Sequence, residues 1–195
     1  MAESGTVLDI IQRSKDDIAY SHRTIDHEHS EIHSGKYYTA KINTSALGAS
    51  SWVDMEIITP STATAVVHLY VECVNSGGLA EIVIADLSTS STYTHGATAV
   101  NRINRNRLSS NTANMTVFTA GTNGAFLTST MTSTQATLLD NYYLGSTGSV
   151  ISAGSYARGR NKDELVLAGA STYVVRLWNR NAAGAATLAA YWYEV

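Results

Sequence analysis

The chain has 195 residues, a formal net charge of −3 at pH 7, one cysteine and only 15% charged residues. This length is typical of one domain, the weak negative charge excludes a global basic field for nucleic acid, and the lone Cys73 excludes an intramolecular disulfide. No apolar run approaches the roughly 20 residues of a membrane span, and Met1–Tyr20 lacks a signal-peptide pattern. We therefore expect a chain made in a cytosol that binds neither nucleic acid nor membrane.

The N-terminal segment Thr6–Tyr20 carries the one helix-like pattern that we identify. Its irregular apolar stripe comprises Val7, Leu8, Ile10, Ile11 and Ile18. A helix this short is marginal alone, so an extended arm that orders on a partner fits equally well. We divide the chain into an arm or short helix, residues 1–21, and a β-domain, residues 22–195.

From Lys36 onward the apolar residues recur with the period of short β-strands. Short strands separated by turn residues, with no helices between them, are typical of two packed sheets. The pattern predicts an all-β fold, a β-sandwich or jelly roll, behind the N-terminal arm or short helix. The expected strands are Tyr37–Ile42, Trp52–Thr59, Thr64–Val74, Leu79–Leu87, Thr116–Ala120, Ala136–Leu144, Asp163–Leu167, Thr172–Asn179 and Thr187–Val195.

The clearest strand is Thr64–Val74, in which Val67, Leu69, Val71 and Cys73 share one face. Cys73 is therefore expected as a buried thiol. The turn signal Asn75–Gly78 follows, and Leu79–Leu87 is predicted as the hairpin partner. Gly145–Arg160 is rich in glycine and serine and is predicted as a long loop.

Four of the six histidines, His22, His27, His29 and His33, lie in one segment with acidic residues between them. Imidazole and carboxylate are suitable ligands for a divalent ion, and on a strand His27 and His29 would share a face. The spacing matches no established metal motif, so a polar hydrogen-bonded segment or a contact between copies is the alternative. We expect no cofactor.

The basic cluster is Asn101–Arg107, in which Arg105 and Arg107 share a face with Ile103 if the segment is extended. Asparagine and arginine at this density can fix turns by donating to backbone carbonyls. A contact with another subunit or with an acidic surface is the alternative. Three arginines without interleaved aromatic residues do not resemble a nucleic-acid site.

Catalytic motifs for nucleophilic serine, zinc-protease or nucleotide chemistry are absent from the sequence. Asp54 and Glu56 share a strand face, but solvent-facing acids on a β-face are common, and we expect no enzyme activity. The tryptophans and most tyrosines lie in expected strands as core or interface residues. Exposed aromatic residues in or near loops would indicate a glycan groove, with candidates Tyr93, Tyr142, Tyr143 and Tyr156.

Three separated stretches resemble a family of tailed-phage virion structural proteins. The first is Ile25–Tyr38, with a histidine before a His-x-Gly-Lys-aromatic entry to the first strand. The second is Asn101–Arg107, similar to an Asn-x-Asn-Arg element. The third is Leu165–Val195, with an Arg-x-x-Asn element at Arg176–Asn179 and a Trp-Tyr-Glu end at Trp192–Glu194. The resemblance covers the chain from about Ile25 to its end.

The resemblance implies a head decoration, or cement, protein: a β-sandwich, often trimeric, on the outer surface of the capsid. The major capsid protein and further copies of the chain would then be its partners, and the virion its location. Candidate contact residues are Val7, Leu8, Ile10, Ile11, His27, His29, His33, Lys36, Arg105 and Arg107. The alternatives are a tail, baseplate or fibre module that binds another virion protein or a host glycan, and a glycan-degrading enzyme using Asp54 and Glu56.

Overall fold

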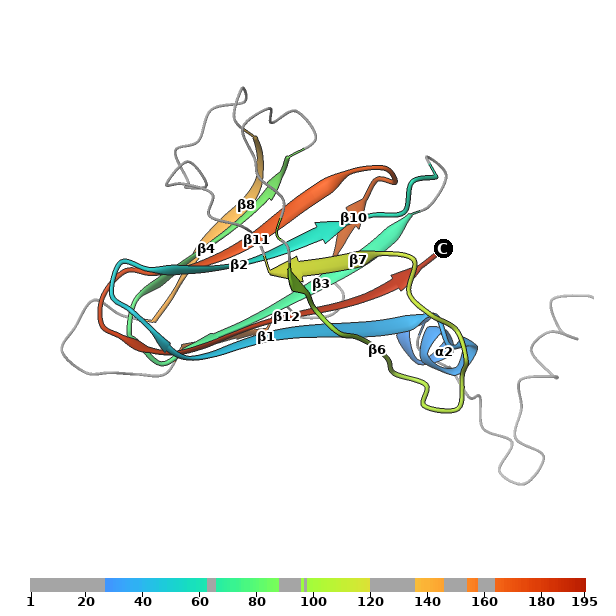
Figure 1. Ribbon diagram of the computed structural model, residues 1–195, viewed down its shortest axis with the longest axis horizontal. Helices are drawn as coiled ribbons and strands as arrows, with labels where there is room; N and C mark the ends of the chain where they lie inside the picture. Colours follow the sequence, from blue (N-terminus) through green and yellow to red (C-terminus); the bar gives the residue numbers. More distant parts are fainter. Residues whose placement is uncertain are drawn as a thin grey trace, which may run out of the picture.

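The fold is a sandwich of two antiparallel β-sheets, each with six strands (Figure 1). A computed structural model of the chain describes residues 27–62, 66–87, 96, 98–119, 136–145, 154–157 and 164–195. The predicted all-β sandwich is confirmed. None of the helices in these residues is long and apolar enough to cross a bilayer.

The first sheet has the strand order β10-β3-β12-β1-β6, and β9 pairs with β3 beside β10. Its central strands β1 and β12 pair along almost their whole length. The bounds are β1 (Tyr37–Leu47), β3 (Val67–Asn75), β6 (Arg102–Asn104), β9 (Gly154–Ala157), β10 (Leu165–Leu167) and β12 (Gly184–Glu194).

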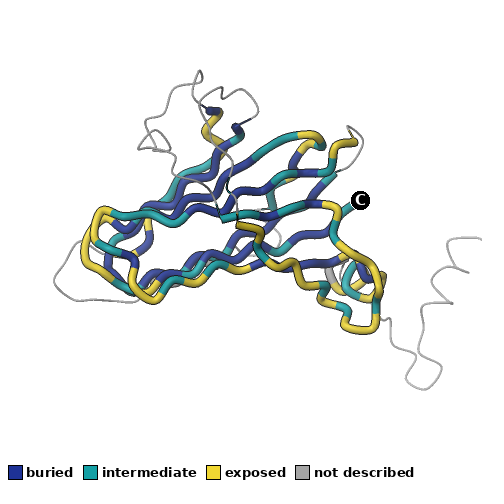
Figure 2. The backbone as a smooth tube through the Cα atoms, viewed as in Figure 1, coloured by how far each residue is buried: buried dark blue, intermediate teal, exposed yellow. Residues whose placement is uncertain are grey.

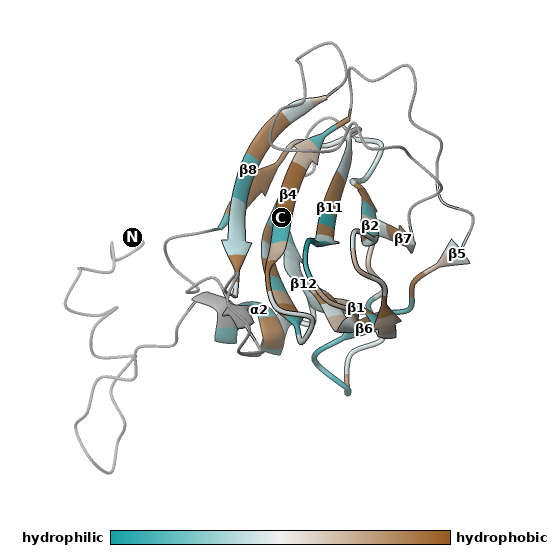
Figure 3. Ribbon diagram, turned by 90° about the vertical axis from the view of Figure 1, so that its left-hand side faces the viewer, coloured by the Kyte–Doolittle hydropathy of each residue, from teal (hydrophilic) through white to brown (hydrophobic). Residues whose placement is uncertain are grey.

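The second sheet has the order β5-β7-β2-β11-β4-β8. The edge strand β8 carries both hydrophobic and hydrophilic residues (Figure 3). The bounds are β2 (Trp52–Ile58), β4 (Ala80–Asp86), β5 (Thr98–Ala99), β7 (Thr116–Thr119), β8 (Thr137–Leu144) and β11 (Thr172–Asn179). A short helix, α2 (His27–Ser34), precedes β1.

The core lies between the facing sheets. The predicted inward face of β3 is confirmed, because Val67, Leu69 and Cys73 are fully buried. They pack in one cluster with residues such as Trp192 of the first sheet and Ile82 of the second. Buried residues follow the strands, while exposed ones gather at the corners and around α2 (Figure 2).

The predicted hairpin between β3 and β4 is wrong. β3 pairs with β12 in the first sheet and β4 pairs with β11 in the second, so residues 76–79 turn a corner between the sheets. The alternation of apolar residues reports which face of a strand is buried and does not report which strand lies beside it. Two more corners, residues 48–51 and 180–183, lie at the same end of the sandwich (Figure 1).

Asn179, the last residue of β11, joins two of these corners, residues 48–51 and 180–183. Its Nδ2 donates to the carbonyls of Leu47, Gly48 and Ala182 at 3.2, 3.2 and 2.5 Å. The side chain is fully buried, and so is Leu47, so the bond to the Leu47 carbonyl satisfies an acceptor in the interior. These two corners are therefore fixed by one side chain from the Arg-x-x-Asn element.

Other expectations about local structure need correction. The segment from His27 is helical, and β9 lies within the stretch Gly145–Arg160 that was predicted as a loop. The short strands β5 and β6 were not predicted, because two or three residues carry no readable alternation. The expected helix or arm Thr6–Tyr20 lies outside the described residues.

Candidate functional site

Helix α2 and the loop after β6 lie together at one end of the sandwich (Figure 1). We call residues 105–115, which connect β6 to β7, the asparagine loop. The platform denotes α2, Gly35, Lys36 and the asparagine loop. Two asparagine Nδ2 groups join its two segments: Asn106 donates to His33 O at 3.0 Å and Asn111 to Ser34 O at 3.4 Å. Asn104, the last residue of β6, adds a bond from Nδ2 to Gly35 O at 2.9 Å.

The tip of the asparagine loop is a β-turn closed by Ser109 N donating to Asn106 O at 3.1 Å. The Asn106 carboxamide supports it from inside, because its Oδ1 accepts from Leu108 N at 3.0 Å. Leu108 is 98% exposed on this braced turn. The chain therefore holds one large apolar side chain in solvent on a backbone with defined hydrogen bonds.

Glu194 fixes the far end of the asparagine loop to β12. Its carboxylate accepts from the backbone N–H groups of Asn114 and Met115, both at 2.9 Å, and from Trp192 Nε1 at 3.1 Å. Arg102 Nη1 adds bonds to the carbonyls of Ala113 and Met115. The prediction that asparagine and arginine fix turns in this region is confirmed.

Two open depressions flank the base of the asparagine loop, with volumes of about 400 and 420 Å³. Tyr38, Asn111 and Thr112 line both of them. Burial, and secondarily the nearby Glu194 carboxylate, raises the pKa of Tyr38. Both Glu194 oxygens already accept backbone hydrogen bonds, so this carboxylate is held as a structural acceptor.

The histidines of α2 are arranged differently from the prediction. On a helix, residues two apart point about 200° apart, so His27 and His29 do not share a face and the expected clamp is wrong. The helix instead brings His29 and His33 together, with 3.0 Å between their Nε2 atoms. The described residues contain no group of three or more His, Cys, Asp or Glu side chains that could hold a metal ion.

The platform gathers five of the predicted contact residues as exposed side chains: His29, His33, Lys36, Arg105 and Arg107. For His27 the structure describes the helical backbone alone, and Val7, Leu8, Ile10 and Ile11 lie outside the described residues. Sequence reasoning missed Leu108. A single apolar residue in the polar run Arg105–Asn111 was the signal that could have indicated it.

Asp54 and Glu56 share the outer face of β2, as predicted, but both are buried instead of facing solvent. Arg176 lies opposite Asp54 and donates from Nε to Oδ1 at 2.7 Å and from Nη2 to Oδ2 at 2.6 Å. Burial raises the pKa of Asp54, and the Arg176 bonds oppose that shift. Glu56 accepts from Gly96 N at 2.8 Å. Both acids are thus engaged in structural bonds.

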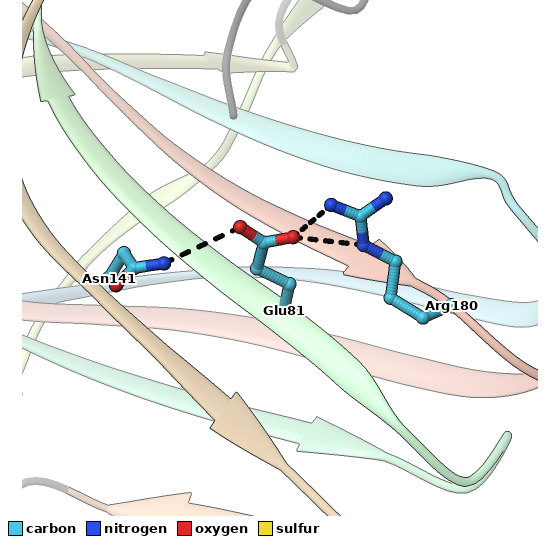
Figure 4. Close-up of polar contacts among 3 residues, drawn as sticks. All are labelled: Glu81, Asn141 and Arg180. Carbon is cyan, nitrogen blue, oxygen red and sulfur yellow. Dashed lines mark hydrogen bonds and ion pairs between the residues drawn. The ribbon is translucent and has the colours of Figure 1, made fainter. Parts of the chain in front are cut away.

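A third buried acid, Glu81 on β4, also faces outward from the second sheet. Its carboxylate pairs with Arg180, whose Nε lies 2.9 Å from Oε2, and it accepts from Asn141 Nδ2 at 3.4 Å (Figure 4). The Arg180 guanidinium lies 3.5 Å from the centre of the Trp178 ring. These polar groups stabilise the outer face of the second sheet.

A tyrosine-rich cluster covers the outer face of the first sheet below α2, with Tyr37, Tyr70 and Tyr193 buried together. Tyr193 donates to Glu164 Oε1 at 2.7 Å, and the same oxygen lies 2.6 Å from His68 Nδ1. Burial, and then the Glu164 hydrogen bond, raises the pKa of Tyr193 well above its ordinary value.

The aromatic residues proposed for a glycan groove do not form one in the described residues. Tyr143 is 56% exposed on β8, whereas Tyr142 packs against the core. Tyr93 and the side chain of Tyr156 lie outside the description.

Fold and site together define an all-β sandwich protein that presents a braced, polar platform with one exposed leucine. No protein-family model matches the chain, and no curated protein matches it. Among solved structures, an unassembled KI polyomavirus VP1 pentamer aligns with 92% of this chain and 81% of its own, at 11% identity and a TM-score of 0.16. A TM-score this low does not establish a shared fold.

Proposed function

We propose that the chain is a non-enzymatic structural protein of a tailed-phage virion that decorates the outer capsid surface through its platform. The observation that carries the proposal is the exposed Leu108 side chain on a turn braced by Asn106. A rigid apolar anchor loses little conformational freedom on binding, so more of its contact free energy contributes to affinity. At many protein interfaces a few well-packed side chains supply most of the binding free energy.

The charges around the anchor indicate the chemistry of the partner. Lys36, Arg105 and Arg107 are exposed on the platform, although the whole chain has a net charge of −3. An acidic surface with an apolar pocket for Leu108 would complement this arrangement, and opposite charges would speed association. Electrostatic attraction of this kind weakens with added salt.

The resemblance to phage virion proteins supports the capsid as that surface. Two of the resembling stretches, Ile25–Tyr38 and Asn101–Arg107, meet in the platform, and Glu194 of the third fixes the asparagine loop. We propose a homotrimer, which would present three platforms and gain avidity from simultaneous contacts. The buried bonds of Asp54 and Glu56 support a binding function over hydrolysis.

The direct test is co-sedimentation of the purified chain with expanded, undecorated capsids. The wild type should be a trimer by light scattering and should sediment with capsids at a fixed stoichiometry. Leu108→Asp should abolish sedimentation without loss of thermal stability, since the side chain makes no buried contact. Val166→Ser is the matched control. Val166 is 63% exposed on β10, which lies at one edge of the first sheet, whereas the asparagine loop follows β6 at the other edge.

The N-terminal arm is tested separately by deleting Met1–Tyr20. We expect the shortened chain to lose capsid binding and to keep the β-sheet circular dichroism spectrum of the wild type. Undiminished binding would remove Val7, Leu8, Ile10 and Ile11 from the contact surface and leave the platform as the anchor.

Failure of the wild-type chain to sediment with capsids would overturn the proposed decoration function. The tail, baseplate or fibre alternative would then be tested on a glycan array, with Tyr143→Ser as the first variant. Capsid binding that survives Leu108→Asp would keep the virion function and reject the platform as its anchor.

A further inference from the structure

His29 and His33 form a close imidazole pair on the exposed face of α2. They are four residues apart, which places them one above the other on the same side of a helix. Their Nε2 atoms are 3.0 Å apart, and their ring centres are 4.6 Å apart with 69° between the ring planes. Both side chains are exposed, so solutes reach them directly.

The helix that carries the pair is held in place from two sides. Ile32 packs against the cluster of Tyr37, Tyr70 and Tyr193 on the first sheet. At the other side the Asn106 carboxamide donates to the His33 carbonyl at 3.0 Å. The two imidazoles therefore project from a positioned turn of helix, which lowers the entropic cost of bringing them together on a ligand.

The separation of the nitrogen atoms suits a shared metal ion. Two bonds of about 2.0–2.1 Å from one ion place their nitrogens about 2.8–3.0 Å apart at the right angle of tetragonal coordination, and about 3.3–3.4 Å apart at the tetrahedral angle. The observed 3.0 Å fits the first geometry and is a few tenths of an ångström short of the second. When an ion binds, the ring whose Nε2 carries the shared hydrogen would hold its proton on Nδ1 instead, which leaves both Nε2 lone pairs for the ion.

We propose that His29 and His33 form a two-histidine site for a late first-row divalent ion: Cu²⁺, Ni²⁺ or Zn²⁺. The described residues offer no group of three His, Cys, Asp or Glu side chains, so water completes the coordination of the ion. Imidazole sites follow the general affinity order of these metals, so Cu²⁺ should bind most tightly. The pair lies on the platform, but ion binding by the free chain is a separate property, and it can be measured without capsids.

The test is calorimetric titration of the full-length chain, without an affinity tag, with Cu²⁺ and then with Ni²⁺ and Zn²⁺. We expect one ion per chain at this site, and nitrogen hyperfine structure from two imidazoles in the Cu²⁺ electron paramagnetic resonance spectrum. His29→Ala and His33→Ala should each weaken binding by at least roughly tenfold, since loss of even an outer-sphere partner commonly costs this much. Both residues are exposed, so the metal-free variants should unfold at the wild-type temperature.

The matched control is His27→Ala, which removes a histidine of the same helix that does not share their face. It should retain wild-type affinity and the same spectrum. Undiminished binding in the double variant of His29 and His33, or loss of binding in His27→Ala, would overturn the proposal. Absence of any binding by the wild type would overturn it as well.

Discussion

Arg176 and Asp54 face each other across β11 and β2 as a two-pronged ion pair, with side-chain exposures of 0% and 2%. The guanidinium also lies 4.6 Å from the centre of the Trp52 ring. Two charges removed from water in this way depend on each other, because loss of either one removes the opposite charge that compensates its partner.

Asp54→Ala should therefore lower the free energy of unfolding by about 3–5 kcal/mol, the usual cost of removing one partner of a buried ion pair. Urea denaturation of the variant and the wild type at pH 7 measures this difference in the free energy of unfolding. Arg107→Ala, an exposed arginine, should change stability by less than about 0.5 kcal/mol. A loss below about 1 kcal/mol in Asp54→Ala would show that the pair is not desolvated as described.

Gly35→Ala should destabilise the platform. Gly35 has a φ of +74°, and an added Cβ would lie 2.2 Å from Ser109 Oγ and 2.6 Å from Ser109 Cβ. A side chain in this backbone region costs about 1–3 kcal/mol, and the clash would push the asparagine loop away from α2. We expect lower thermal stability together with weaker capsid sedimentation.

Gly48→Ala is the comparison for that variant, because its φ lies outside the left-handed region and its nearest contact, Ser51 Oγ, is 3.0 Å away. It should leave both stability and sedimentation close to wild type. Equal effects of the two alanines would contradict the described packing of Gly35 on Ser109.

Asn179→Ala should open the corner end of the sandwich. The substitution leaves the carbonyls of Leu47, Gly48 and Ala182 without the Asn179 bond. Of these three residues only Leu47 is buried, and a buried acceptor left unsatisfied costs about 1–3 kcal/mol. Guanidinium denaturation of the variant and the wild type measures the loss in the free energy of unfolding. Asn43→Ala removes an exposed asparagine that accepts only from Thr187 among the described contacts, and should cost less than about 0.5 kcal/mol.

Tyr193 should make the fold sensitive to alkali. Its pKa is raised in the folded chain, so above the ordinary tyrosine pKa of about 10 the unfolded chain releases a proton that the folded chain keeps. Stability should then fall by up to about 1.4 kcal/mol per pH unit for such a tyrosine, and should be unaffected by this group below pH 10.

Urea denaturation between pH 9.5 and 11 measures that slope. Tyr193→Phe removes the Glu164 hydrogen bond and should make the dependence of stability on pH shallower. Tyr143→Phe changes a tyrosine that is 56% exposed and should show the same pH dependence as the wild type. Parallel curves for wild type and Tyr193→Phe would show that other groups govern alkaline unfolding.

Much of the fold was readable from the sequence, because burial on one face of a strand leaves a local pattern. β11 spans the predicted Thr172–Asn179, and β2 ends at Ile58, one residue before the predicted end at Thr59. Strand partners are not encoded locally. The turn at Asn75–Gly78 looks the same whether it closes a hairpin within one sheet or a corner between two sheets.

The candidate site was only partly predictable for a similar reason. The histidine and arginine segments were identified separately, but their meeting depends on bonds such as Asn106 to His33, which joins residues 73 apart. The predicted pairing of His27 with His29 was wrong because it assumed an extended segment. On the helix, His33 lies beside His29 instead of His27. Leu108 was missed because a lone apolar residue has no period.

The long strands β1 and β12 separate the platform from the three corners. Each has 11 residues and spans roughly 36 Å at about 3.3 Å per residue. Ala49 and Ser50 are exposed at the β1–β2 corner, where the chain turns without a buried side chain of its own. A peptide inserted between them would be carried outward, clear of an anchored platform, so the sandwich has the geometry of a display scaffold for particle surfaces.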